Sequence, residues 1–258
     1  MNLIRARFRQ GMRTMAWPDG PASLPSRFRG RPVLDQSRCI DGCRACADAC
    51  PTGAVHGAPL RMDLGACLFC PACAEACPTG AIQFSSDFRL AASARQDLQL
   101  SGEAPASTDA DAETRRLAVA LPAATRRLFG RSLKLRQVSA GGCNGCEADL
   151  NVTGIVVFDL GRFGVQFVAS PRHADGIVVT GPVTANMEQA LRDTWEAVPS
   201  PRLLIAVGAC ALSGGPFIGS APCGAGVPSD LHVDLFVPGC PPHPLTFLDG
   251  ILRMLGRL

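Results

Sequence analysis

The chain lacks tyrosine altogether and is poor in aromatic residues, which make up 5% of its 258 residues. No apolar stretch reaches the ~18 residues of a membrane-spanning helix, so we expect any membrane contact to be peripheral. A formal net charge of +3 is too small and too dispersed to indicate nucleic-acid binding. The N-terminus also lacks the apolar core of a signal peptide, which favours a reducing compartment over a disulfide-bonded secreted protein.

Familiar catalytic patterns are missing as well. There is no phosphate-binding or dinucleotide-binding glycine motif, and no Ser-His-Asp arrangement is indicated. The four histidines are scattered, and we interpret each as structural rather than catalytic: His56, His173, His232 and His243. The residues that remain to explain function are the thirteen cysteines.

Residues 1–16 place Ile4, Phe8 and Met12 at helical spacing, with arginines on the neighbouring faces. This pattern predicts a basic amphipathic helix in an N-terminal segment that we assign to residues 1–30. Packing on the chain's own domain or on a partner is favoured over binding to a membrane surface, and a transit peptide is a weaker third alternative.

A two-fold repeat follows between residues 31 and 95. The stretch CRACADACPTGAV, from Cys43, matches CPACAEACPTGAI, from Cys70, with an offset of 27 residues at each cysteine. The second copy reads Cys-x2-Cys-x2-Cys-x3-Cys-Pro, the run found in bacterial ferredoxins, in which three thiolates bind one cluster and the fourth binds the other. The region is therefore expected to be a ferredoxin domain with two 4Fe-4S clusters.

The first copy has one extra residue between Cys39 and Cys43, which we place in a bulge at Asp41-Gly42 because glycine tolerates the dihedral angles of a bulge. Cys39 is still expected to be a ligand. The crossed arrangement gives cluster 1 the ligands Cys39, Cys43, Cys46 and Cys77, and gives cluster 2 the ligands Cys67, Cys70, Cys73 and Cys50. A pair of zinc sites is the alternative, since paired Cys-x2-Cys motifs also bind zinc, but eight thiolates in two Cys-Pro-ended runs favour iron-sulfur clusters.

The rest of the chain alternates short apolar runs with helical patterns. Residues 96–130 are read as a linker, since 101–114 are polar and cannot bury enough apolar area to fold alone. Strands are expected over residues 133–138, 165–169, 176–180, 203–207 and 233–237, with a helix over 185–198. This alternation predicts a doubly wound parallel sheet in a domain of residues 131–258, with sites beyond the carboxyl ends of the strands.

Four of the last five cysteines follow predicted strands, and these are Cys143, Cys146, Cys210 and Cys240. Parallel strands end at one edge of a sheet, so these thiolates are expected to converge on one metal site. Neighbouring glycines (Gly142, Gly145, Gly208 and Gly239) would let the backbone approach an inorganic core. Four thiolates suit either a third 4Fe-4S cluster or zinc. Cys223 has no such placement and is interpreted as a buried apolar cysteine.

These motifs carry a resemblance to known families. Residues 133–258 resemble the B subunit of complex I and the small subunit of membrane-bound nickel-iron hydrogenases, through GGCNGCE, SPRHADGIVVTGPVT, GACALSGG and VPGCPP. The N-terminal part, with FRGRP from Phe28 and both cysteine runs, resembles the two-cluster ferredoxin subunit of formate hydrogenlyase. The resemblance implies a flavodoxin-like sheet domain fused to a bacterial-type ferredoxin domain, three 4Fe-4S clusters, and a group 4 hydrogenase complex on the cytoplasmic face of the inner membrane.

Two departures from the complex I pattern favour the hydrogenase branch. That family has adjacent cysteines at the first ligand position and a tyrosine at its quinone site, whereas this chain has Cys-x2-Cys and no tyrosine. His243-Pro244-Leu245 stands where Arg-Pro-Glu is common, which affects the expected partner contacts. Glu147 matches a family residue near the large-subunit interface; it could pass protons there, or it could form a salt bridge at an exposed edge.

The resulting functional hypothesis is an iron-sulfur electron-transfer subunit, an oxidoreductase component, that passes electrons through the two ferredoxin clusters to a third cluster beside the active site of a hydrogenase large subunit-like partner. The nickel site would lie in that partner, together with other subunits of the complex. The alternatives are the equivalent subunit of a nickel-free, complex I-like quinone or ion-pumping oxidoreductase, and a stand-alone iron-sulfur carrier or sensor.

Overall fold

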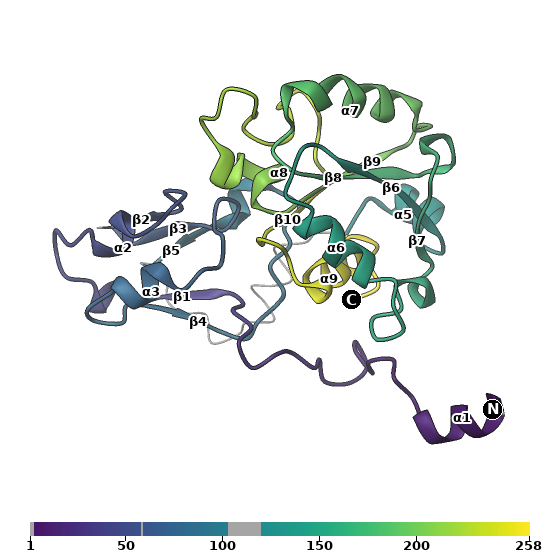
Figure 1. The fold of residues 1–258 in the computed structure, drawn as a ribbon, viewed down its shortest axis with the longest axis horizontal. Helices are drawn as coiled ribbons and strands as arrows, with labels where there is room; N and C mark the ends of the chain where they lie inside the picture. The colour runs from purple at the N-terminus through teal and green to yellow at the C-terminus, as the bar shows by residue number, and fades with distance from the viewer. Residues whose placement is uncertain (1–2, 58, 103–119) are drawn as a thin grey trace.

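The computed structural model describes residues 3–57, 59–102 and 120–258. Figure 1 shows a small N-terminal part, built around short helices and two small antiparallel sheets, beside a larger part built around a five-stranded parallel sheet. The predicted fold class is therefore confirmed: a ferredoxin-type part precedes a flavodoxin-like α/β part. No helix among the described residues is both long enough and apolar enough to cross a membrane.

The internal repeat is visible in the N-terminal part. Helices α2 (Ala45–Asp48) and α3 (Ala72–Ala76) each follow a cysteine turn, and Gly53 and Gly80 take the same left-handed backbone angle after them, with φ of 64° and 62°. Strand β1 (Pro32–Leu34) pairs with β4 (Ile82–Phe84), and β2 (Val55–His56), β3 (Arg61–Asp63) and β5 (Gln99–Ser101) form the second sheet. Short 3-10 turns lie at η1 (Gln36–Arg38) and η2 (Arg95–Leu98).

Ordered structure extends into both ends of the segment expected to be a linker. Strand β5 pairs with β3, with Ser101 opposite Arg61, so residues 99–101 belong to the N-terminal sheet. At the other end, α5 (Ala123–Phe129) buries Phe129 in the core of the larger part. Most of the polar stretch 101–114 lies outside the described residues. The linker boundaries expected at 96 and 130 therefore do not match the elements of the structure. Residues 99–101 hydrogen-bond to β3, and Phe129 is buried in the core of the larger part.

The larger part contains the strands expected from the sequence. They are β6 (Leu133–Ser139), β7 (Val165–Phe167), β8 (Gly176–Thr180), β9 (Leu203–Val207) and β10 (Leu235–Val237). All pair in parallel in the order β10-β9-β8-β6-β7, the strand order of flavodoxin-like sheets. Helices α6 (Gly145–Val152), α7 (Ala185–Ala197), α8 (Ala209–Ser213) and α9 (Pro244–Met254) connect or follow them, with 3-10 turns η3 (Leu160–Phe163), η4 (Pro171–His173) and η5 (Gly215–Phe217).

Alternating side chains of the strands build a core on each face of this sheet. Ile177 and Val179 of β8 pack with Leu191 of α7, whereas Val178, between them, packs with Phe247 of α9 on the other face. Figure 1 shows α7 above the sheet and α6 and α9 below it. Both faces are covered, so the central strands β8 and β9 are buried along their whole length, as expected for a parallel sheet. This arrangement leaves the carboxyl ends of the strands as the accessible edge.

The two parts pack against each other. Ala92 and Phe236 form an isolated antiparallel bridge, and Ala206, Ala211 and Leu212 of the larger part share a core with residues of the ferredoxin-type part. The N-terminal segment joins them, with Trp17 packed edge-on against Phe88 and Phe163. We infer from these contacts that the cysteine-rich part is held in a fixed position relative to the sheet edge.

The N-terminal helix differs from the rest of its segment. Helix α1 (Leu3–Gln10) buries none of its residues, and Leu3, Phe8 and Met12 are at least 80% exposed. Figure 1 shows α1 at the end of the chain, apart from both parts. The basic amphipathic helix expected from the sequence is present, but it does not pack on its own domain, because its apolar face has no counterpart there.

Candidate functional site: three groups of cysteines

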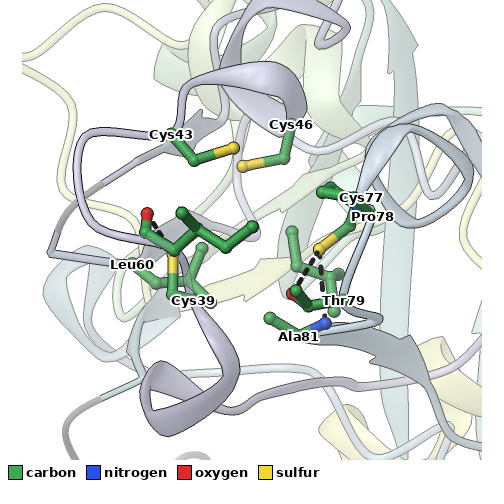
Figure 2. Close-up of a pocket in the computed structure, with 10 residues that line it drawn as sticks. Cys39, Cys43, Cys46, Leu60, Cys77, Pro78, Thr79 and Ala81 are labelled. Atoms are coloured by element: carbon green, nitrogen blue, oxygen red, sulfur yellow. Dashed lines mark hydrogen bonds between the residues drawn. The ribbon is translucent and has the colours of Figure 1, made fainter.

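The first group contains three cysteines of the first run and one of the second. Cys39, Cys43, Cys46 and Cys77 line one cavity, with about 300 Å³ of atom-free space, part of it open to solvent. Figure 2 shows Cys39, Cys77 and the Cys43-Cys46 pair on different sides of this space. Burial, followed by the neighbouring Cys43 and Cys77, raises the pKa of the Cys39 thiol. The structure thus brings together the four residues predicted for cluster 1.

The second group is the complementary set, Cys50, Cys67, Cys70 and Cys73. Burial raises the pKa of Cys67 to about 12 and that of Cys73 to about 11. After burial, the next contributions that raise both values come from the other thiols of this group, Cys50 among them. Cys50 therefore lies with the second run, although it belongs to the first. Closely spaced buried thiols cannot all ionise without a cation, which suits a metal cluster.

Matching turns supply hydrogen bonds to the cysteine that ends each run. The amide of Ala54 donates to Cys50 Sγ at 3.2 Å, and the amide of Ala81 donates to Cys77 Sγ at 3.3 Å. The hydroxyls of Thr52 and Thr79 lie 3.8 Å and 3.7 Å from the same two sulfurs. The two amides stabilise thiolate charge, as cluster ligands require. Neither threonine was identified from the sequence, although the repeated Pro-Thr-Gly was a usable signal.

The pKa values of these two cysteines reflect the same hydrogen bonds. Burial alone would raise the pKa of Cys50 and of Cys77, but the hydrogen bonds of the turn that follows each cysteine outweigh it, and both pKa values are lowered. The remaining thiols of the two groups whose pKa values shift are raised instead. Each group therefore contains one cysteine whose thiolate form is favoured by the hydrogen bonds of the turn that follows it.

The extra residue of the first run is absorbed in a tight turn. The amide of Cys43 donates to the carbonyl of Ile40 at 3.0 Å, and Gly42 takes a φ of 72°, which agrees with the bulge expected at Asp41-Gly42. In the second run, the residue before the equivalent cysteine, Phe69, is also left-handed, with a φ of 53°. Arg29 Nε donates to the Phe69 carbonyl at 2.6 Å, which helps to hold this unfavourable backbone.

The third group forms at the carboxyl edge of the parallel sheet. Cys143 follows β6, Cys146 lies in α6, Cys210 lies in α8 after β9, and Cys240 follows β10. Burial, followed by Cys240 and Cys143, raises the pKa of Cys210 to about 11. Burial, followed by Glu147 and then by the other three thiols, raises the pKa of Cys146. The predicted convergence of the strand ends therefore brings these four cysteines close together.

Glycine is required where β9 meets this group. Gly208 has a φ of 89°, and a Cβ atom built on it would collide with Cys146 Sγ. Gly145 is less tight, since a Cβ there would lie 3.5 Å from Cys143 Sγ. The expectation that glycine lets backbone approach the site thus applies most strongly at Gly208.

The groups also approach one another. Burial, then Cys143, and then Cys70 of the second group raise the pKa of Cys240. Cys240 shares a cleft with Leu68 and Phe69, the two residues that precede Cys70. Cys46 of the first group contributes in the same way to Cys73 of the second. The three groups therefore lie in series from the ferredoxin-type part to the sheet edge.

Donor chemistry decides which metals these groups fit. Among the described residues, no three Cys, His, Asp or Glu side chains are arranged to hold a single metal ion. Each group instead offers four thiols, and the first two add amide donors to sulfur. Four thiolates that accept such hydrogen bonds are the donor set that iron-sulfur clusters use, so the residues fit such a cofactor.

Glu147 is buried rather than exposed. Its side chain is in the first turn of α6, the residue is 5% exposed, and its Oε1 accepts from Ser139 Oγ at 2.6 Å and from Thr180 Oγ1 at 2.7 Å. The expectation of a carboxylate at an exposed edge was wrong, because the ends of β6 and β8 enclose it. Ser139 and Thr180 were not identified from the sequence, and only their positions at the ends of predicted strands could have suggested them.

The remaining cysteine and the histidines lie in different settings. Cys223 is half-buried on a loop where it forms an isolated bridge with Thr184. His243 Nδ1 accepts from the amide of Leu245 at 3.2 Å at the start of α9, and its ring contacts Phe28. His232 has a side chain that is 86% exposed, and His56 and His173 are exposed as well.

A ferredoxin-type repeat joined to a thiol-lined edge of a flavodoxin-like sheet defines an iron-sulfur electron-transfer subunit of an oxidoreductase. The family of the NADH ubiquinone oxidoreductase 20 Kd subunit matches residues 143–254, and the 4Fe-4S dicluster domain matches residues 31–78. The chain belongs to the 20 Kd subunit family and carries the dicluster domain in front of it.

Individual relatives come from several multisubunit enzymes. The chain is 40% identical over 132 residues to the probable membrane-bound hydrogenase subunit mbhJ of Pyrococcus furiosus, which covers 51% of this chain and 79% of that protein. It is 41% identical to formate hydrogenlyase subunit 7 of Escherichia coli over 50% of each chain. It is also 41% identical to the B subunit of the NADH-quinone oxidoreductase of Heliobacterium modesticaldum, over 44% of this chain and 65% of that one.

Among solved structures, a chain of the membrane-bound sulfane sulfur reductase, an archaeal respiratory membrane complex, matches 52% of this chain and 73% of its own length. The two are 27% identical, with a TM-score of 0.46. The relatives confirm the resemblance drawn from the cysteine motifs: this chain is an oxidoreductase subunit with an iron-sulfur domain, and its relatives include subunits of a membrane-bound hydrogenase and of a formate hydrogenlyase.

Proposed function

We propose that the chain binds three 4Fe-4S clusters and passes electrons between its ferredoxin-type part and the active site of a hydrogenase large subunit-like partner, in a formate hydrogenlyase-like complex. Iron-sulfur clusters supply one-electron transfer at potentials that the surrounding protein sets. The proposed ligands are Cys39, Cys43, Cys46 and Cys77 for cluster 1, Cys50, Cys67, Cys70 and Cys73 for cluster 2, and Cys143, Cys146, Cys210 and Cys240 for cluster 3.

The observation that carries this proposal is the proximity of Cys70 and Cys240 across the interface between the two parts. Burial, then Cys143, and then Cys70 raise the pKa of Cys240, and Cys70 and Cys240 belong to different parts of the fold. Cys240 lines a cleft together with Phe69, the residue before Cys70, and with other residues of both parts. A continuous series of thiol groups through a packed interface supports electron transfer along the chain rather than storage at one site.

The third group supports a partner at the sheet edge. Cys143 and Cys240 are exposed although both are proposed ligands, and Ile218 is 58% exposed on the loop after η5. A metal cluster and apolar side chains at one open edge favour burial by another subunit. All twelve clustered cysteines are assigned to iron-sulfur ligation, so a nickel site would belong to that partner. We place the complex on the cytoplasmic face of the membrane, with this chain peripheral.

A second candidate is the equivalent subunit of a nickel-free quinone or ion-pumping complex. The identity to the B subunit of an NADH-quinone oxidoreductase supports it, whereas the Cys-x2-Cys spacing at Cys143 and the lack of tyrosine favour the hydrogenase branch. Purification of the chain with its native partners separates the two: nickel in the large subunit supports the first, and a nickel-free complex supports the second. A chain that purifies alone, without any partner, contradicts both.

Pairs of cysteine substitutions test the crossed ligand sets. In the full chain prepared anaerobically, Cys50→Ala with Cys67→Ala should remove only cluster 2 and leave about eight of about twelve irons, whereas Cys50→Ala with Cys39→Ala should remove two clusters and leave about four. If each run instead bound its own cluster, the two results would be exchanged. Iron and sulfide analysis gives the counts, and Cys223→Ala, which should retain all the iron, is the control.

A further inference from the structure

Helix α1 combines apolar and basic side chains that remain at the surface. Ile4 and Phe8 are one helical turn apart, and Arg5 and Arg9 repeat this spacing one residue later. None of the residues of the helix is buried, and Phe8 is 84% exposed. Figure 1 shows α1 apart from the sheets and helices that form the two cores. A short apolar stripe bordered by arginines is therefore presented to the surroundings of the molecule.

A short connection ties this helix to the larger part. The amide of Met15 donates to the Val157 carbonyl at 2.9 Å, and Arg162 Nη1 donates to the Met15 carbonyl at 2.9 Å. Gln10, the last residue of α1, is five residues from Met15, so its Cα lies within about 18 Å of that of Met15. Helix α1 therefore stays close to the loop that contains Val157.

Exposed apolar side chains are also found where the connection meets the larger part. Ile155 and Val156, which directly precede Val157, are 47% and 60% exposed. Met12, which is 80% exposed, lies in the connection, and Arg7 of α1 donates to its Sδ at 3.3 Å. The apolar side chains of α1 and those of the loop after α6 are therefore linked by a short stretch of chain that is itself apolar and exposed at Met12.

Positive charge is concentrated in the same segment. No acidic residue precedes Asp19, so residues 1–18 have a formal charge of +4, which exceeds the +3 of the whole chain and leaves −1 for the remaining residues. Charge complementarity therefore points to a negatively charged surface as the counterpart of the helix. The residues that carry this charge are Arg5, Arg7, Arg9 and Arg13.

We propose that α1 lies in the interface of an anionic lipid bilayer and supplies the peripheral membrane contact of this chain. Helices with arginines on one side and apolar residues such as phenylalanine on the other bind in the plane of a membrane surface, where the apolar side chains enter the acyl boundary and the guanidinium groups meet anionic headgroups. Packing on a partner subunit, which the sequence pattern favoured, would need fixed carboxylates at the spacing of the arginines, whereas mobile headgroups meet them at any spacing. The proposal rests on the proposed function only in placing the complex at a membrane, and it needs no cluster.

Vesicle flotation with the full chain, prepared anaerobically, tests the proposal. The chain should float with phosphatidylcholine vesicles that contain about 30% phosphatidylglycerol at low salt, and much less with pure phosphatidylcholine or at about 0.5 M salt. Arg5→Gln with Arg9→Gln should weaken binding to the anionic vesicles about thirty-fold, because two charges near the surface are lost. Ile4→Ser with Phe8→Ser should weaken it at least about ten-fold, because the apolar side chains no longer enter the bilayer.

Leu128→Ser with Arg127→Gln is the matched control. Leu128 is 61% exposed in α5 and Arg127 is exposed beside it, so this pair removes the same kinds of side chain from another basic helix and should bind like the original chain. Iron content should be equal in all variants, which shows that the fold is retained.

Three outcomes overturn the proposal: equal binding to neutral and anionic vesicles, unchanged binding in the two α1 variants, and a chain that binds no vesicles, as expected if α1 packs on a partner subunit instead. A chain that binds anionic vesicles but no iron contradicts the proposed function and supports this proposal.

Discussion

The two parts of the molecule collect their cysteines in different ways. In the ferredoxin-type part, three members of each group come from one short run, and the fourth comes from the other run. In the sheet part, the four cysteines come from the three segments that follow β6, β9 and β10, and only the parallel strands bring these segments together. The first kind of site depends on local turns, whereas the second depends on the assembly of a whole sheet.

The supporting interactions differ accordingly. Around Cys50 and Cys77, backbone amides of the following turn donate to sulfur. Around Cys146, the closest constraint is steric, since the backbone of Gly208 leaves no room for a side chain. Loss of the hydrogen bonds in the turns should therefore affect the clusters of the ferredoxin-type part. A side chain added at Gly208 should affect the cluster of the sheet part.

The largest effect is expected from Gly208→Ala. The added methyl group would collide with Cys146 Sγ, and the φ of 89° is unfavourable for alanine. We expect loss of cluster 3 alone, which removes about four of about twelve irons and leaves the clusters of the ferredoxin-type part. Iron analysis and electron paramagnetic resonance check this result.

Gly219→Ala is the matched control, because Gly219 has a φ of 82° but open space around its Cα. It carries the same backbone cost without the collision, so its iron content should equal that of the original chain. If the two variants lost the same amount of iron, backbone strain rather than steric exclusion would be the cause, and the contrast between the two parts would be weaker.

A smaller effect is expected from Asp63→Asn in the ferredoxin-type part. Arg95 donates to the two carboxylate oxygens of Asp63 at 2.7 Å and 2.6 Å, and the amide of Gly65 adds a third bond. Although burial opposes it, Arg95 and these bonds lower the pKa of Asp63 below its ordinary value of 3.8. The loss of charge should cost about 2 kcal/mol of unfolding free energy, which thermal unfolding under anaerobic conditions would measure.

The sign of the pH dependence follows from this lowered pKa. The stabilisation is complete above pH 3.8 and is lost only as pH falls through the folded value, so the difference between the original chain and Asp63→Asn should stay constant from about pH 8 to about pH 5. A difference that already narrows in that range contradicts the prediction. Asp48→Asn breaks an exposed pair with Arg44, 3.6 Å apart, and should leave the unfolding temperature unchanged.

The smallest effect is expected from Gly42→Ala, at about 1 kcal/mol, because the φ of 72° costs an L-residue about that much and nothing lies within 4 Å of the new methyl group. Gly42→Asn should cost less, since asparagine tolerates the left-handed region better. Unfolding temperatures of the two variants give the comparison. A large loss of iron in Gly42→Ala would show that the turn at Gly42 also constrains the ligands.

Much of the fold could be read from the pattern of apolar residues and cysteines. The five strands of the sheet and helix α7 lie within two residues of their expected positions at each end, because alternation and cysteine spacing are local signals. Strand β5 could not be predicted from the sequence, because Gln99–Ser101 becomes a strand only by pairing with β3. The burial of Glu147 was also missed, because it depends on Ser139 and Thr180 from two different strands.

The donor chemistry was already set in the covalent chain: the number of thiols, their spacing, the repeat, and the glycines beside them can all be read from it. Which thiols face one another depended on folding. The packed structure placed Cys50 with the second run, set Cys70 near Cys240 across the interface, and enclosed Glu147 between two strand ends. The physical reason is that these contacts join residues far apart in the chain, and only the packing of strands and helices around a common core fixes such distances.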